Sequence, residues 1–110
     1  MHISLHKIIN KEGIIIKEFY KTNTCQLYQG DCLEVMDYLI EQGVKVDMVL
    51  TDIPYGTTQC KWDSVIPFVP MWERINKVNK INGCVALFGS EPFSSQLRCS
   101  NIKNYKYDWK

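Results

Sequence analysis

Apolar residues recur along the middle of the chain in short continuous runs. Two such runs stand at 46–51 (VDMVLT) and 83–89 (GCVALFG), and 25–29 (CQLYQ) is a shorter strand-like segment. Runs this short and this apolar are typical of strands that are covered on both faces, as in parallel sheets. We therefore predict strands at these three ranges.

Between the predicted strands at 25–29 and 46–51, apolar residues recur at intervals of three and four. This spacing predicts a helix over 32–42. Asp31 stands at the N-cap position, and Glu34 three residues later completes a capping-box-like pair. Gly43 suits the position that follows the last helical turn. The predicted buried face of this helix comprises Leu33, Met36, Leu39 and Ile40.

Two further helices follow the same spacing rule. One is predicted to start at Pro70 and to run to about Lys80, because proline suits a first helical turn and restricts the residue before it. The other is predicted to begin with Ser90 as its cap and Pro92 in its first turn. The segment 105–110 (YKYDWK) is predicted to begin another strand.

This alternation of strands and helices predicts an α/β fold with a mainly parallel sheet over residues 24–110. Residues 1–23 are predicted to form an N-terminal extension, in which 3–9 and 14–20 pair as a β-hairpin around Lys11–Gly13. Functional loops of parallel sheets lie at the carboxyl ends of the strands. Three polar turns fall at such ends, and they are Gly30–Asp31, Asp52–Gly56 and Gly89–Glu91.

Composition narrows the class of protein without naming a function. Of 110 residues 45% are hydrophobic and 23% are charged, as in ordinary globular chains. No apolar run approaches the roughly 18 residues of a membrane span, and the N-terminus lacks the pattern of a signal peptide, so a cytoplasmic location is expected. The formal net charge of +1 carries no electrostatic footprint for nucleic acid.

The five cysteines are Cys25, Cys32, Cys60, Cys84 and Cys99, and they include no C-x-x-C pair. We expect free thiols that serve as small apolar residues. His2 and His6 have no third ligand beside them, so no metal site is predicted.

The turn TDIPYG (51–56) places a carboxylate, a proline and an aromatic ring directly after a predicted strand. Methylation of the exocyclic amine of adenine or cytosine needs acceptors for its two hydrogens, because these stabilise the positive charge that develops on the nitrogen. A carboxylate and a neighbouring main-chain carbonyl supply both acceptors. An aromatic ring can then stack on the base, which must first leave the duplex.

TDIPYG resembles the D-P-P-Y motif of the DNA amino-methyltransferases, which use S-adenosylmethionine to methylate adenine or cytosine amino groups. Other segments resemble the subgroup whose catalytic motif is N-terminal, and they are GDCLEVMDYL (30–39), KWD (61–63), MWERINKV (71–78) and ALFGSEPF (86–93). The resemblance covers roughly residues 25–110. It implies part of a Rossmann-like methyltransferase fold.

The resemblance implies that Asp52 and the carbonyl of Ile53 or Pro54 accept hydrogen bonds from the target amine. Tyr55 is expected to stack on the flipped base. Gly56 is expected to let the chain pass close to the ligand.

Other residues are assigned to the cofactor and to DNA by the same resemblance. S-adenosylmethionine is expected to contact Asp31, Cys32 and Asp52. Two roles stay open for Trp62, which are packing under the turn and contact with DNA.

The chain departs from the family pattern at two points. Ile53 stands where the motif has proline, so its φ is restricted only by the following Pro54. The glycine-rich cofactor loop of the subgroup has no counterpart in the 110 residues, which are expected to be the N-terminal portion of an enzyme. We expect the intact protein to methylate double-stranded DNA, with homodimer formation open, and these residues alone to show no measurable transfer.

Two alternatives remain open. The same kind of turn could serve a methyltransferase that acts on RNA or on a protein glutamine amide. The chain could also be a non-catalytic remnant that binds DNA or a partner.

Overall fold

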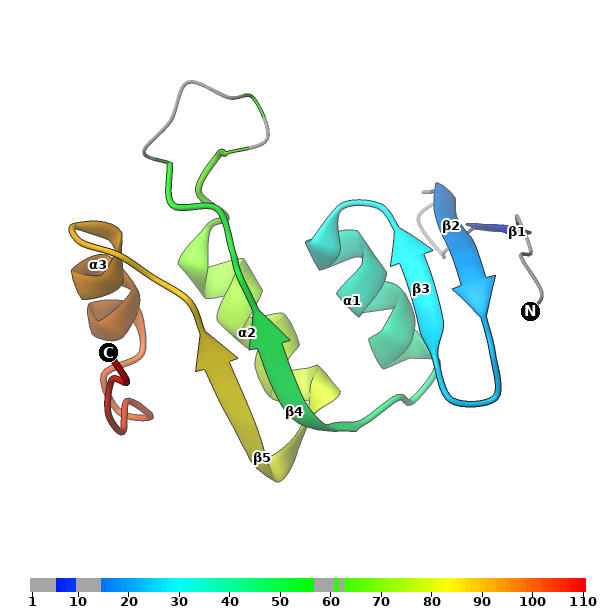
Figure 1. Ribbon diagram of the computed structural model, residues 1–110. Helices are drawn as coiled ribbons and strands as arrows, with labels where there is room; N and C mark the ends of the chain where they lie inside the picture. Colours follow the sequence, from blue (N-terminus) through cyan, green and yellow to red (C-terminus); the bar gives the residue numbers. More distant parts are fainter. Residues whose placement is uncertain (1–5, 10–14, 57–60, 62) are drawn as a thin grey trace. The chain divides into compact units, whose positions relative to one another are not determined.

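A computed structural model describes residues 6–9, 15–56, 61 and 63–110, with the backbone alone described at 6–9, 15–17 and 19 (Figure 1). The chain divides into an N-terminal unit, Met1–Val44, and a C-terminal unit, Lys45–Lys110, and each is described by itself. Three strands come first in the described part of the chain, and helices and strands alternate after them. This confirms the α/β class.

The N-terminal unit contains a three-stranded antiparallel sheet and one helix (Figure 1). Its strands are β1 (His6–Ile9), β2 (Ile15–Lys21) and β3 (Gln26–Gln29), and its helix is α1 (Cys32–Glu41). Strands β1 and β2 pair antiparallel, as expected for the predicted hairpin. The turn of this hairpin, at Lys11–Gly13, lies outside the described residues. The prediction of a mainly parallel sheet is wrong for β3, which pairs antiparallel with β2 because the short turn between them permits no crossover.

Helix α1 begins and ends as its sequence predicts. The Asp31 carboxylate accepts hydrogen bonds from the main-chain N–H groups of Leu33 (2.9 Å) and Glu34 (3.4 Å). Gly43 has a φ of 71°, a left-handed conformation that glycine adopts without steric cost, and its N–H donates to the carbonyl of Ile40. The predicted apolar face is half-buried.

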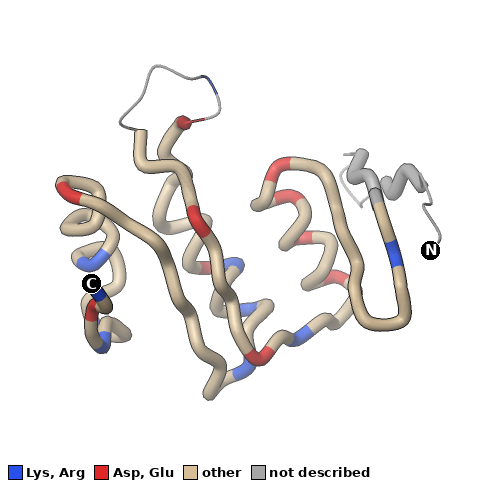
Figure 2. The backbone as a smooth tube through the Cα atoms, in the orientation of Figure 1, with Lys and Arg blue, Asp and Glu red and all other residues tan. Residues whose placement is uncertain are grey.

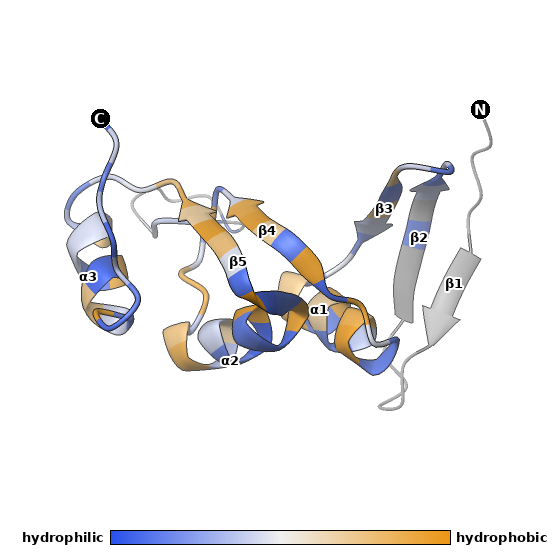
Figure 3. Cartoon of the chain, turned by 90° about the horizontal axis from the view of Figure 1, so that it is seen from below, coloured by the Kyte–Doolittle hydropathy of each residue, from blue (hydrophilic) through white to orange (hydrophobic). Residues whose placement is uncertain are grey.

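The C-terminal unit is built around a parallel strand pair. Strand β4 (Val46–Thr51) leads through α2 (Phe68–Val78) to β5 (Asn79–Leu87), and α3 (Phe93–Ser100) follows. Helix α2 lies against one face of the pair (Figures 1 and 3). The predicted strand–helix–strand unit is therefore present.

The buried side chains of the C-terminal unit come mainly from α2 and α3. Helix α2 starts at Phe68, two residues before the predicted Pro70, because the N–H groups of a first turn need no intrahelical acceptor and proline is tolerated there. The indole N–H of Trp72 donates to the Ser100 hydroxyl (2.8 Å), which joins α2 to α3. The buried apolar residues are Ile53, Met71, Ile75, Val78, Phe93 and Leu97.

The strand at 46–51 is confirmed, but its predicted burial on both faces is wrong, and so is the strand predicted at 105–110. The apolar run of β4 is not covered on both faces, since Met48 and Leu50, which share one face of the strand, are 49% and 62% exposed. Residues 105–110 form no strand, because no ladder of main-chain hydrogen bonds joins them to a neighbour in the described part of the chain. Arg98 instead holds this segment through Asp108, with 2.8 Å between the guanidinium and the carboxylate.

The predicted cap of α3 also differs. The N-cap residue is Pro92, with no side-chain cap, and the helix begins at Phe93. Ser90 is therefore not the cap. Its main-chain carbonyl accepts the N–H of Ser94 instead (2.9 Å).

The described cysteines are all exposed, and they are Cys25, Cys32, Cys84 and Cys99. Free thiols are confirmed at Cys25, Cys84 and Cys99, and their exposure argues against the expected use as small apolar packing residues. Cys60 lies outside the described residues.

Candidate functional site

Two of the three predicted functional turns meet at one edge of the parallel pair. Thr51 and Leu87 are register partners, and the N–H of Phe88 donates to the carbonyl of Thr51 (3.2 Å). The turn formed by Asp52–Gly56, called here the 52–56 turn, therefore lies beside the segment Gly89–Glu91. The third turn, Gly30–Asp31, follows β3 in the N-terminal unit.

The first residues of the 52–56 turn differ sharply in exposure. The Ile53 side chain is buried, at 7% exposure, whereas Asp52 is exposed. Pro54 is half-buried. The turn is therefore anchored in the interior by Ile53, and the Asp52 carboxylate stays at the surface.

Tyr55 contacts both the carboxylate and the core. Its hydroxyl donates to Oδ1 of Asp52 (2.9 Å), and its ring stacks on Phe93 with 5.1 Å between centroids and 23° between planes. Phe93 itself is 1% exposed and also meets Phe68 at 5.9 Å. Desolvation and the hydrogen bond to Asp52 raise the pKa of the Tyr55 phenol above its usual value, so the group remains a donor.

The end of the 52–56 turn is held by a buried carboxylate. Oδ1 of Asp63, a residue with 7% exposure, accepts the N–H groups of Tyr55 and Gly56, each at 3.0 Å. Gly56 has a φ of 71°, and a Cβ at this position would lie 2.6 Å from Cγ2 of Val65. The close approach seen at Gly56 is thus to Val65, and its expected approach to a ligand stays a prediction.

The predicted site residues are divided between the two units. Asp31 and Cys32 are exposed and belong to the N-terminal unit, at the start of α1. Trp62 lies outside the described residues. Sequence reasoning missed Asp63 and Phe93 as parts of this site, although the KWD segment and the spacing of α3 marked both positions.

Glu91 lies at the same edge, but its carboxylate binds residues of α3. Its carboxylate accepts the hydroxyls of Ser94 (2.7 Å) and Ser95 (2.6 Å) and pairs with Arg98 (2.6 Å). The hydrogen bonds from Ser94 and Ser95, with a contribution from Arg98, lower the pKa of Glu91 to about 2. Glu91 therefore stays ionised and stabilises the start of the helix.

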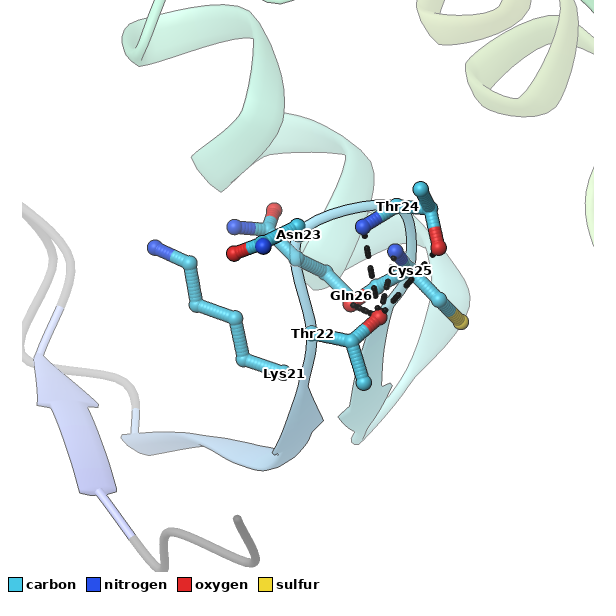
Figure 4. Close-up of a pocket in the computed structure, with 6 residues that line it drawn as sticks. All are labelled: Lys21, Thr22, Asn23, Thr24, Cys25 and Gln26. Carbon is cyan, nitrogen blue, oxygen red and sulfur yellow. Dashed lines mark hydrogen bonds between the residues drawn. The ribbon is translucent and has the colours of Figure 1, made fainter. Parts of the chain in front are cut away.

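An open hollow in the N-terminal unit is lined by Lys21–Gln26, the turn between β2 and β3 (Figure 4). The hydroxyl of Thr22 accepts the N–H groups of Thr24 (3.3 Å) and Cys25 (3.0 Å). The polar groups of this hollow thus close the turn, and none of the predicted site residues lies in it.

Three further findings concern metal ligands, membrane-spanning helices and similarity to known proteins. Within the described ranges, no three His, Cys, Asp or Glu side chains are grouped so that they could hold a metal ion. Nor does any helix in those ranges have the length and apolar character needed to cross a bilayer. Comparison with protein-family models, with curated proteins and with solved structures finds no match to the chain.

Proposed function

We propose that the chain carries the base-binding turn of an S-adenosylmethionine-dependent DNA amino-methyltransferase with a Rossmann-like fold. The observation that supports this most is the exposed Asp52 carboxylate at the carboxyl end of β4, beside the Tyr55 ring. This is the edge at which α/β sheets bind ligands. The target is the exocyclic amine of adenine or cytosine.

Asp52 retains capacity to accept the amine while it binds Tyr55. An ionised carboxylate offers about four lone-pair sites, and the Tyr55 hydroxyl occupies one of them at Oδ1. The main-chain carbonyl of Ile53 or Pro54 is the second acceptor. Together they stabilise the charge that grows on the nitrogen as the methyl group is transferred.

Tyr55 presents one ring face to a base. Its other face is already stacked on Phe93, which is held in the core. A ring fixed in this way loses little conformational freedom when a base stacks on it, and stacking of this kind contributes about 1–3 kcal/mol per base. Gly56 and Trp62 are the neighbouring positions proposed to contact DNA.

The cofactor residues proposed from the resemblance are Asp31, Cys32 and Asp52. Asp31 caps α1 and still remains exposed, so its carboxylate fits a role as acceptor for a polar ligand. When bound, S-adenosylmethionine supplies the electrophilic methyl group. Because the 110 residues contain no glycine-rich cofactor loop, we expect them to transfer no measurable methyl on their own.

Charge gives little help in binding, so the experiment must isolate base recognition. Acidic positions are spread along α1, while basic positions occur on α2 and near the C-terminus (Figure 2). The formal net charge is only +1. Nonspecific attraction to phosphate is therefore expected to be weak.

The test is a titration of the chain with short single-stranded oligonucleotides, in which no base has to be extruded from a duplex. One oligonucleotide carries a single adenine, a second carries cytosine, and matched controls carry the N,N-dimethylated bases, which lack both amine hydrogens. Binding is followed through the amide resonances of the 52–56 turn. We expect one amino base to bind about tenfold more tightly than its dimethylated control, since hydrogen bonds to a charged acceptor are strong.

Asp52→Ala is expected to remove this preference and leave the weaker stacking. The matched control is Asp47→Ala, because Asp47 is an exposed carboxylate paired with Lys80 and its loss removes the same charge. A preference that survives Asp52→Ala, or no preference in the unaltered chain, contradicts the proposed function. A primary amide that binds in place of the base would favour a glutamine-modifying enzyme.

A further inference from the structure

The 52–56 turn has no proline at its second position, yet its main chain is restrained from outside. Ile53 leaves φ unlocked where a proline would fix it. Asp63 lies seven and eight residues further along the chain and binds the N–H groups of Gly56 and Tyr55. The restraint that the sequence lacks at Ile53 is thus present at the other end of the turn.

A buried carboxylate is a specific way to hold two amides. Asp63 has 7% exposure, and taking a carboxylate out of water is costly unless hydrogen bonds compensate. Two consecutive N–H groups that converge on one oxygen fix the peptide plane between Tyr55 and Gly56. The two bonds have an ordinary length of 3.0 Å, and bonds to a charged acceptor are in general about twice as strong as neutral ones.

We infer that Asp63 is a positioning residue, which holds the 52–56 turn so that the Asp52 carboxylate and the neighbouring main-chain carbonyl keep one mutual orientation. This inference rests on the proposed function for its chemical purpose. Three contacts act together on successive residues. The Ile53 side chain is buried, the Tyr55 ring stacks on Phe93, and Asp63 binds the amides that follow.

The first measurement concerns the turn alone and needs no ligand. Amide hydrogen exchange is compared in the unaltered chain, Asp63→Ala and Asp63→Asn. We expect the amides of Tyr55 and Gly56 to exchange about tenfold faster or more in Asp63→Ala. Asp63→Asn keeps a side-chain carbonyl that accepts both N–H groups, so it should restore most of the protection.

The second measurement repeats the oligonucleotide titration in the same variants. A positioning role predicts that Asp63→Ala lowers the preference for the amino base over its dimethylated control, while stacking on Tyr55 is weakened less. Asp63→Asn should recover the preference. Asp47→Asn, an exposed carboxylate changed in the same way, is the control and should change neither quantity.

The outcomes separate this inference from the proposed function. If Asp63→Ala leaves exchange at Tyr55 and Gly56 unchanged, or weakens both ligands equally, the positioning role is wrong. If Asp63→Ala does not fold, the same two measurements are made on Asp63→Asn. Full protection of the Tyr55 and Gly56 amides together with a lost preference for the amino base would contradict the inference. If the unaltered chain shows no preference, the proposed function fails, and the exchange data still test whether Asp63 holds the turn.

Discussion

Gly56 gives the most direct test of the geometry of the 52–56 turn. Its φ of 71° lies in the left-handed region, where a residue with a Cβ costs about 1–2 kcal/mol. A Cβ there would also lie 2.6 Å from Cγ2 of Val65, and overpacking of this kind typically costs about 1–3 kcal/mol. Gly56→Ala should therefore destabilise the C-terminal unit by about 2–5 kcal/mol.

Gly43 is a matched control within the same chain. It has the same φ of 71°, but a Cβ at Gly43 meets nothing within 4 Å. Gly43→Ala should therefore carry the backbone cost alone, about 1–2 kcal/mol, in the N-terminal unit. The difference between the two substitutions measures the contact with Val65.

The double variant Gly56→Ala/Val65→Ala isolates that contact further. Val65 is 42% exposed, so Val65→Ala alone should cost little. Together the two changes should be less destabilising than the sum of their separate effects, with a coupling of about 1 kcal/mol or more.

The assay is urea unfolding followed through amide resonances, which report the two units separately. The reasoning is refuted if Gly56→Ala costs no more than Gly43→Ala. It is also refuted if Val65→Ala brings no relief to Gly56→Ala.

Two further predictions concern the helix starts. Asp31→Ala removes the acceptor of two α1 amides and should destabilise the N-terminal unit by about 0.5–2 kcal/mol, seen as faster amide exchange in α1 and not in β4 or β5. Because the folded pKa of Glu91 is lowered to about 2 from a usual 4.5, its contribution to stability is present above pH 4.5 and is lost as the pH falls from 4.5 to about 2. Glu91→Gln should flatten the pH dependence of urea unfolding in that window, and an unchanged slope would contradict the role assigned to Ser94, Ser95 and Arg98.

The parts of the fold that depend on near neighbours in sequence were predictable. The cap at Asp31 and the stop at Gly43 follow from residues within four positions of each helix end. The helical spacing also predicted α2, whose buried residues are Met71, Ile75 and Val78. These features need no knowledge of what packs against the helix.

Strand partners were less predictable, because an isolated strand is defined by what it pairs with. The run at 46–51 correctly gave a strand parallel to β5, joined by a helix of sufficient length. CQLYQ was assigned to the same sheet, although the short turn before it requires antiparallel pairing with β2. Residues 105–110 alternate as a strand would, yet no strand beside them completes a ladder in the described part of the chain.

The candidate site divides in the same way. The sequence placed Asp52 and Tyr55 at the carboxyl end of a strand, and the structure confirms that position. It did not predict Asp63 or Phe93 as partners of the turn, because Asp63 lies eight residues beyond Tyr55 and Phe93 lies beyond both α2 and β5. Local pattern therefore identified the chemical groups, whereas tertiary contacts determine how they are held.

The exposed Asp52 carboxylate precedes residues that contact the interior of the C-terminal unit. Burial of the Ile53 side chain stabilises the turn by about 1.5–3 kcal/mol, which is comparable to a strong hydrogen bond. Phe93 restrains the Tyr55 ring, and Asp63 restrains the amides after it. The convergence of these contacts on residues 53–56 is the geometry on which the binding role proposed for Asp52 depends.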